Sequence, residues 1–332
     1  MSLLTSPPSS PVLVPPMRRP ASVLRTSTVL MTWPNGVGSG LRLQGRCRDL
    51  LTSRNGSLTV IRQAEIDALT GSEREIVSIT STPATPGLDR LLGRRAGGNL
   101  RVSIGQELPD HSDAGTPPLL LLDDLAGSTL IAGFAYVRWA DHLVGFRERM
   151  RQAPPRYMRD ICSGFRGGAS SLLSDGTMAG HSQNVPEVPP LVDPDDPMGW
   201  HELDVHPPMA LRRARRIDVW DIDGTLGIDA MFRDSCWEPD GTEVAVHEYQ
   251  ITATAPRDTG TLLSITAEPR VLPYLECPLA APNAVWLIGT KLRELRQEVL
   301  VQLRGTDCCT HLNDALRSLA EVPVIADLLP TS

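Results

Sequence analysis

The stretch HEYQITATAPRDTGTLLSITA, residues 247–267, decides the fold of this chain. β-Branched and alternating apolar residues at 247–255, and again at 262–267, are typical of half-buried strands. The intervening Arg257-Asp258-Thr259-Gly260 has the composition of a hairpin turn. Residues 226–232 show the same strand pattern upstream. The sequence therefore predicts a small antiparallel sheet in the C-terminal half.

The pattern changes to helical spacing after residue 287. Apolar side chains recur every three or four positions before Gly305 interrupts the run, at Leu292, Leu295, Val299 and Leu303. A last helix is predicted from Thr310 onwards, with its buried face formed by Leu312, Ala315, Leu316 and Leu319. Strands followed by helices that cover one face of the sheet are typical of an α+β fold.

Proline-rich stretches divide the chain, because proline removes a backbone donor and fixes φ. We expect a disordered tail at residues 1–20, an N-terminal unit at 21–180, a proline-rich linker at 181–209 and a C-terminal domain at 210–328. A chain of 332 residues is long enough for two domains of ~100 to 200 residues each.

The two units have the features of diverged copies of one repeat. Residues 78–83 (SITSTP) match residues 264–269 (SITAEP), and an Arg-Asp pair precedes each copy, at 48–49 and at 233–234. We therefore expect each unit to form its own small antiparallel sheet packed by helices. The short apolar run at residues 119–122 predicts a further buried strand in the first unit.

The composition favours a cytoplasmic protein whose partner is a small molecule or another protein. The net charge of −7 disfavours nucleic acid and anionic membranes, because both bind clustered positive charge. No apolar stretch is long enough to predict a membrane span. The six scattered cysteines are typical of free thiols in a reducing compartment, not of a disulfide scaffold.

The candidate functional site lies at the start of the last predicted helix. Cys308, Cys309 and His311 are placed where free backbone N–H groups and the helix dipole favour a thiolate and keep an imidazole neutral. Cys277 follows the third predicted strand, and Asp234 ends the first. We expect these five residues to supply the ligands of a metal ion, with zinc and an iron–sulfur species as alternatives. His311 is also the candidate base, and the competing interpretation is that the cysteines only pack the core.

A second motif is Asp221-Ile222-Asp223-Gly224-Thr225-Leu226. It reproduces the DxDGTL signature of haloacid-dehalogenase-like phosphatases, and this resemblance implies Asp221 as nucleophile and Asp223 as acid and base, with magnesium. The charged segment before the motif and the lack of a later paired-acid motif favour a glycine turn between two strands instead.

Two further features have structural interpretations. His247 lies in a strand of alternating character, which favours a hydrogen-bonded residue of the sheet over a ligand. The basic run formed by Arg212, Arg213, Arg215 and Arg216 is typical of a solvated face beside a linker.

Short motifs along residues 205–325 resemble the bacterial family named domain of unknown function 2889. The similarity rests on RDS at 233–235, HEY at 247–249, ECP at 276–278 and, above all, Cys309-Thr310-His311-Leu312. This resemblance implies no established reaction.

The C-terminal half is also similar to iron–sulfur scaffold proteins of the NifU/IscU type. The order of hairpin strands, Cys277, Gly289 with Lys291, and Cys309 follows that family. The similarity implies Cys277 and Cys309 as ligands and places Cys308 where the scaffold has a histidine. The scaffold's first cysteine has no clear counterpart, which leaves a mononuclear metal as the alternative to a cluster.

Three functions follow from these patterns. The first is binding of a metal ion or iron–sulfur species, the second is a phosphatase that uses the DxDGTL motif, and the third is a non-catalytic interaction protein. Whether the chain is an enzyme stays open at this point.

Overall fold

A single antiparallel sheet of eight strands organises the protein, in the order β4-β3-β2-β1-β5-β6-β7-β8. The computed structural model describes residues 6–13, 16–109 and 115–330. The N-terminal strands are β1 (Ser22–Thr32), β2 (Arg42–Thr52), β3 (Leu58–Thr70) and β4 (Ile76–Thr82). The C-terminal strands are β5 (Leu211–Ile222), β6 (Thr225–Trp237), β7 (Glu243–Pro256) and β8 (Ser264–Val271). The three strands predicted for the C-terminal half are β6, β7 and β8.

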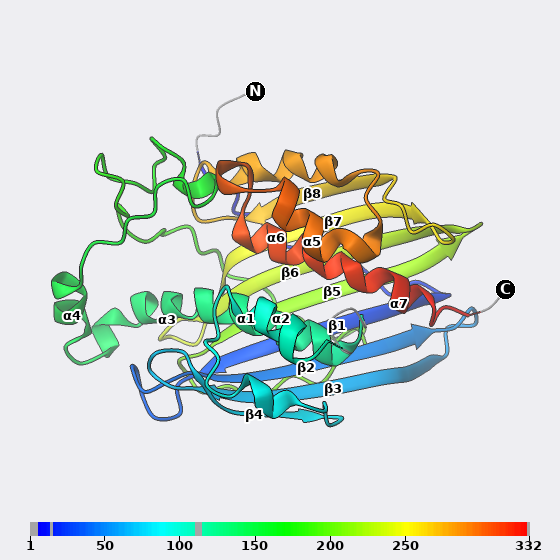
Figure 1. The fold of residues 1–332 in the computed structure, drawn as a ribbon, viewed down its shortest axis with the longest axis horizontal. Helices are drawn as coiled ribbons and strands as arrows, with labels where there is room; N and C mark the ends of the chain where they lie inside the picture. Colours follow the sequence, from blue (N-terminus) through cyan, green and yellow to red (C-terminus); the bar gives the residue numbers. More distant parts are fainter. Residues whose placement is uncertain (1–5, 14–15, 110–114, 331–332) are drawn as a thin grey trace.

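The two halves of the chain share this sheet (Figure 1). Each half contributes four consecutive strands joined as hairpins, and β1 pairs antiparallel with β5 from Ser22↔Trp220 to Met31↔Leu211. The expectation of a separate small sheet in each unit is therefore wrong. The physical reason is that β1 and β5 would otherwise be edge strands with unpaired N–H and C=O groups, and pairing them satisfies both.

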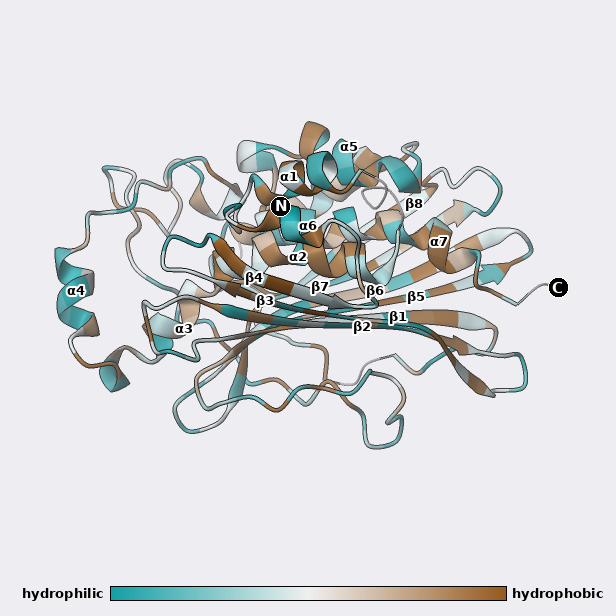
Figure 2. Ribbon diagram, turned by 60° about the horizontal axis from the view of Figure 1, so that its bottom comes forward, coloured by the Kyte–Doolittle hydropathy of each residue, from teal (hydrophilic) through white to brown (hydrophobic). Residues whose placement is uncertain are grey.

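Helices from both halves cover one face of the sheet (Figures 1 and 2). The described helices are α1 (Leu100–Glu107), α2 (Pro117–Ile131), α3 (Gly133–Arg138), α4 (Phe146–Gln152), α5 (Leu295–Gln302), α6 (Thr310–Ser318) and α7 (Val322–Ala326). Short 3-10 segments are η1 (Leu88–Leu91), η2 (Ala140–His142), η3 (Ser163–Phe165), η4 (Cys277–Leu287), η5 (Leu292–Glu294), η6 (Gly305–Asp307) and η7 (Leu319–Glu321). The α+β class and the two predicted C-terminal helices are confirmed.

The apolar run at residues 119–122 belongs to helix α2, so the strand predicted there is wrong. All four leucines of the run are buried, because α2 packs over β1, β2 and β3 while α1 lies against it. A helix that is apolar on every side gives no amphipathic pattern, which is why a short run of this kind does not distinguish helix from strand. By length and composition, Pro117–Arg138 is also the one described helical stretch that could cross a membrane, but 72% of its apolar window is buried inside the protein.

The second face of the sheet is covered by irregular chain, visible below the sheet in Figure 2. Part of the expected linker packs here, since Leu191 and Trp200 form a small core with Ala214 and Met231. The described part of the expected tail also lies on the sheet, where the Val12 N–H donates to Glu248 at 2.5 Å. Described parts of both segments therefore pack against the eight-stranded sheet.

The basic run on β5 is buried, which corrects the expectation of a solvated face. β5 is a central strand, so its alternating side chains enter both covered faces of the sheet. Arg213 and Arg215 point to the helical face, where they meet carboxylates of α2 and α6. Arg212 and Arg216 pair with acids on the opposite face.

A network of ion pairs fills the space between the sheet and the helices. Its acids come from both halves of the chain. The pairs join α2 to α1, α5, α6 and β5, and they join η7 to β1 and α5. The arginines are Arg25, Arg101, Arg213, Arg215, Arg296 and Arg317, and the acids are Asp49, Asp123, Asp124, Asp234, Asp314 and Glu321. Buried charges of this kind are tolerated only when they are paired, so the network fixes how the helices dock.

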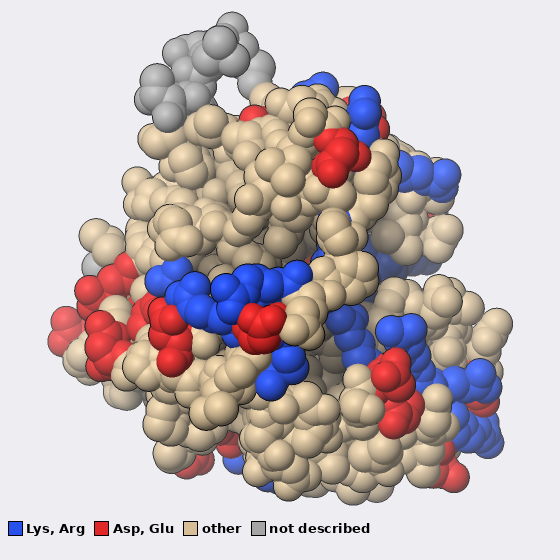
Figure 3. Space-filling view, turned by 90° about the vertical axis from the view of Figure 1, so that its left-hand side faces the viewer, with Lys and Arg blue, Asp and Glu red and all other residues tan. Residues whose placement is uncertain are grey.

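The end of the molecule that carries α4 has mixed charge. Figure 3 shows a band of basic side chains there with acidic side chains beside it. Ion pairs on this surface include Arg147 with Asp141 and Arg151 with Glu148. These exposed pairs contribute little to stability, because solvent screens them.

Candidate metal site

Pairing between β6 and β7 places Asp234 and His247 on one face of the sheet. Asp234 of β6 pairs with His247 of β7, and the register shifts between Asp234 and Ser235. Such a shift places two residues of one strand opposite one of its partner and re-aims the side chains that follow. The carboxylate of Asp234 is fully buried and the imidazole of His247 is nearly so, under the start of α6.

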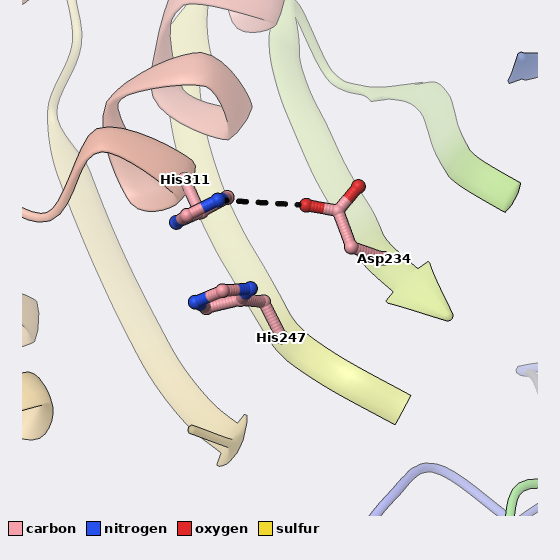
Figure 4. Close-up of side chains that lie close together, drawn as sticks. All are labelled: Asp234, His247 and His311. Atoms are coloured by element: carbon pink, nitrogen blue, oxygen red, sulfur yellow. Dashed lines mark ion pairs between the residues drawn. The ribbon is translucent and has the colours of Figure 1, made fainter. Parts of the chain in front are cut away.

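His311 completes the group from above. It is the second residue of α6, and its ring stacks on that of His247 with the centroids 3.5 Å apart and the planes 16° from parallel. Its Nε2 atom lies 3.8 Å from Oδ2 of Asp234, as the dashed line in Figure 4 shows. Three side chains from β6, β7 and α6 therefore meet at one point.

Both imidazoles have a buried nitrogen without a hydrogen-bond partner among the described residues. These atoms are Nδ1 of His247 and Nε2 of His311. His201, also buried, differs because the hydroxyls of Thr26 and Thr28 lie 2.9 and 2.8 Å from its two ring nitrogens. Buried polar atoms are normally paired, so these two nitrogens beside a carboxylate are candidate ligand atoms.

Both imidazoles are neutral at physiological pH. Burial is the main cause, and it lowers the pKa of His311 from 6.5 to about 3, with Arg213 and Arg215 acting in the same direction. Burial also lowers the pKa of His247 well below 6.5, and the neighbouring His311 lowers it further. A neutral imidazole has a lone pair free to bind a metal or a proton.

Arg213 fixes the carboxylate of the group. Its Nε and Nη2 atoms donate to the two oxygens of Asp234 at 2.9 and 3.0 Å, and its Nη1 donates to Asp314 of α6 at 2.9 Å. Each carboxylate oxygen has a second acceptor position, so this fork orients Asp234 without using up its capacity as a ligand.

The three side chains place candidate ligand atoms close together. One ligand atom from each of Asp234, His247 and His311 lies within 4.8 Å of the others, and within the described ranges no other group of three His, Cys, Asp or Glu residues meets this condition. Two imidazoles and a carboxylate form a ligand set typical of zinc and of non-haem iron(II).

Comparison with known proteins assigns this region to a family. Residues 211–325 match the model described as Protein of unknown function (DUF2889). The C-terminal half is a DUF2889 domain. No curated protein and no solved structure matches the chain. The resemblance seen in the sequence is thus confirmed for this half, whereas the similarity to iron–sulfur scaffolds stays a prediction.

The predicted thiol ligands of the DUF2889 domain lie apart from this group. Cys277 begins η4, Cys308 and Cys309 precede α6, and all three are buried in the apolar core beside the site. They are free thiols, and burial raises the pKa of Cys308 to about 11. The structure therefore brings together Asp234 and His311 of the predicted set and places the three cysteines in a neighbouring cluster.

Two residues of the site were not assigned to it from the sequence. His247 has the strand environment that was predicted, but it also stands directly opposite Asp234 of β6, and the pattern of one strand does not show its register with a partner strand. The available signal was the HEY motif of the DUF2889 resemblance. The sequence predicts a solvent-exposed Arg213, because nothing local identifies its partners: Asp234 and Asp314 are 21 and 101 residues away.

The DxDGTL motif forms the hairpin between β5 and β6. Ile222 pairs with Thr225, which leaves Asp223 and Gly224 as a two-residue turn, both with positive φ. The Asp221 carboxylate accepts from the Gly224 N–H at 2.8 Å and from Arg257 at 2.9 Å. Both acids thus serve an antiparallel turn, and the phosphatase assignment gains no support from this arrangement.

Proposed function

We propose that the DUF2889 domain binds one divalent transition-metal ion through Asp234, His247 and His311. The observation that carries the proposal is the pair of buried, unpartnered imidazole nitrogens beside a buried carboxylate. Leaving such atoms unpaired in a dry environment costs roughly 1–3 kcal/mol each, and a bound cation removes that cost.

Zinc or iron(II) suits these ligands better than an iron–sulfur cluster, because clusters are held mainly by thiolates. Three protein ligands leave at least one coordination position open, as in catalytic zinc sites. The His311 side chain is 12% exposed, so solvent or a small ligand can approach from that side. A metal-bound His311 cannot serve as a base, so any proton transfer would use a metal-bound water instead.

Cobalt(II) binding to the purified protein tests the site. The titration is carried out on Cys277→Ser, so that thiolates do not compete. We expect d–d absorption without thiolate charge transfer that is lost when His247→Asn or His311→Asn is added. His201→Asn is the matched control, since His201 is buried but already has both ring nitrogens paired. Elemental analysis after anaerobic purification then identifies the native metal.

Thermal or urea unfolding gives an independent measurement. An ion at a hundred times its Kd stabilises the native state by about 2.7 kcal/mol. In the same Cys277→Ser protein, zinc or iron(II) is expected to produce this gain, and adding His311→Asn is expected to remove it. A Cys277→Ser protein that takes up no metal, or one whose metal content neither histidine substitution lowers, would contradict the proposal.

We further propose that the two halves arose from one repeat. In each half an arginine faces an aspartate across the first strand pair, as Arg25↔Asp49 and as Arg213↔Asp234, and the register of the next pair shifts directly after that aspartate. Arg62 stands opposite Asp49 where His247 stands opposite Asp234. The N-terminal copy therefore lacks the histidine ligand, and we expect Arg62→Ala to leave the metal content unchanged.

A further inference from the structure

Ser163 hydrogen-bonds its own cysteine-bearing segment to two others in the core. Ser163 is fully buried; its N–H donates to the carbonyl of Cys308 at 2.7 Å and its hydroxyl donates to the carbonyl of Glu276 at 2.6 Å. The neighbours of these residues in sequence are Cys162, Cys277 and Cys309. Four of the six cysteines of the chain, counting Cys308, thus gather beside η3, η4 and α6.

Gly164 shows how closely these segments approach. A Cβ atom at this position would lie 2.5 Å from Sγ of Cys277, closer than real Cβ contacts allow. Glycine therefore lets the sulfur of Cys277 rest against the backbone that carries Cys162. Cys162 and Cys277 are 115 residues apart in the sequence, so only the fold brings them together.

Backbone N–H groups lie near two of the sulfur atoms. Burial raises the pKa of Cys162 and of Cys309, whereas the N–H groups of Gly164 and Phe165 at Cys162, and of His311 and Leu312 at Cys309, act in the opposite direction. Donors of this kind stabilise the negative charge of metal-bound thiolates. A thiol that only packs the core has no need of two backbone donors.

Tyr249 points to a ligand independently. It is fully buried on β7, and its hydroxyl has no nitrogen or oxygen partner in the part of the chain that the structure describes. It meets the sulfur of Cys309 and lies close to Cys277 and Cys162. An unpaired phenol hydroxyl in the middle of a thiol cluster would gain a strong acceptor if those thiols became thiolates.

We propose that Cys162, Cys277 and Cys309 form a second metal site, for a thiophilic d10 ion of the Zn²⁺ class, with Cys308 available as a fourth ligand. No three of the described sulfurs lie within 4.8 Å of one another, so binding closes the cluster by rotation of the cysteine side chains. Each thiol that binds releases one proton to solvent. The partly exposed Cys162 gives the ion its route in.

The site is separate from the one formed by Asp234, His247 and His311, although Cys309 and His311 lie two residues apart. The imidazole of His311 belongs to the group with the carboxylate, whereas Cys309 is directed at Tyr249. Either site can therefore exist without the other, and their tests must use different signals.

Titration of the reduced full-length protein with Cd²⁺ provides the test. Cadmium bound to thiolate gives an ultraviolet charge-transfer absorption that imidazole and carboxylate ligands do not give. We expect it to rise to saturation at one ion per thiol site in the wild type and in His311→Asn. We expect at least a tenfold weaker affinity in Cys162→Ser, Cys277→Ser and Cys309→Ser.

Cys236→Ser is the matched control, because Cys236 is a buried thiol in the core of the other half of the sheet. It should keep the wild-type absorption. Absence of charge transfer in the wild type at equimolar Cd²⁺ would overturn the proposal even if a serine variant failed to fold. So would equal absorption in the wild type and a folded Cys277→Ser, or equal loss in Cys236→Ser.

Discussion

Acid is expected to destabilise this protein through His201, which joins the irregular chain on the second face to the sheet. The hydroxyls of Thr26 and Thr28 on β1 hold both nitrogens of its ring. Burial lowers the pKa of His201 from 6.5 to about 3, and the nearby charges of Arg48 and Arg46 act in the same direction. The ring is therefore neutral in the folded protein throughout the range from pH 4 to 7.

The size of the effect follows from proton linkage. Below pH 6.5 the unfolded chain binds a proton at His201, whereas the folded chain binds it only near pH 3, so stability falls with pH across this window. Each pH unit below the unfolded pKa costs about 1.4 kcal/mol. The loss is about 2 kcal/mol at pH 5 and about 3 kcal/mol at pH 4.

Urea unfolding at pH 7 and pH 5, in the presence of a chelator, measures this loss. His201→Gln removes the titrating group, so its free energy of unfolding should fall between the two pH values by about 2 kcal/mol less than that of the wild type. His142→Gln, at an exposed histidine of η2, should behave as the wild type does. If His201→Gln loses as much stability as the wild type, the neutral buried imidazole is not the cause.

Three further predictions concern packing, charge and the turn. Gly164→Ala should lower the free energy of unfolding by about 1–3 kcal/mol, because its Cβ would clash with Cys277, whereas Gly105→Ala in helix α1, with open space around it, should raise it by about 0.5–1 kcal/mol. Arg213→Met should cost about 3–5 kcal/mol in urea unfolding, since it leaves buried carboxylates without their cation; a loss below 1 kcal/mol would show that the network is not paired as described. Asp223→Val should cost about 1–3 kcal/mol and Asp223→Asn almost nothing, because the turn needs a positive φ; equal losses by calorimetry would refute the turn assignment.

The strands and helices of the DUF2889 domain could be predicted because their signals are local. β6, β7 and β8 appear as alternation, α5 and α6 as helical spacing, and the DxDGTL segment as turn composition. The meeting of Asp234 with His311 could also be anticipated, since one ends a predicted strand and the other begins a helix expected to pack on it.

The rest depends on contacts between distant parts of the chain. Nothing local shows that β1 pairs with β5, and without that pairing the arginines of β5 are expected to face solvent. The pairing of Asp234 with His247 is likewise a property of the β6–β7 register and not of either strand, so the sequence assigned His247 to the sheet alone. The sequence places Cys308 and Cys309 next to His311, which is why the thiols were expected at the same centre. Residues close in sequence can nevertheless face different neighbours.

The proposed metal site and the buried ion network act on the same helix. α6 carries His311, whose ring reaches Asp234, and one turn later Asp314, which accepts from Arg213 at 2.9 Å and from Arg101 at 2.6 Å. Arg213 in turn orients Asp234. A change at Asp314 therefore affects the proposed metal site in two ways, by shifting helix α6 and by loosening the hydrogen bonds of Arg213 to the Asp234 carboxylate. Partners of this kind typically contribute 10- to 100-fold to metal affinity.

Asp314→Asn is therefore expected to weaken cobalt binding about tenfold or more without removing a ligand. Its d–d absorption at saturation should keep the wild-type shape, because the three ligands are unchanged, and circular dichroism verifies that the variant is folded. Asp307→Asn, at an exposed acid in η6 of the same region, serves as the control and should bind cobalt as the wild type does. Unchanged affinity in a folded Asp314→Asn would mean that the site holds its geometry without the network, and that the ion pairs stabilise the fold alone.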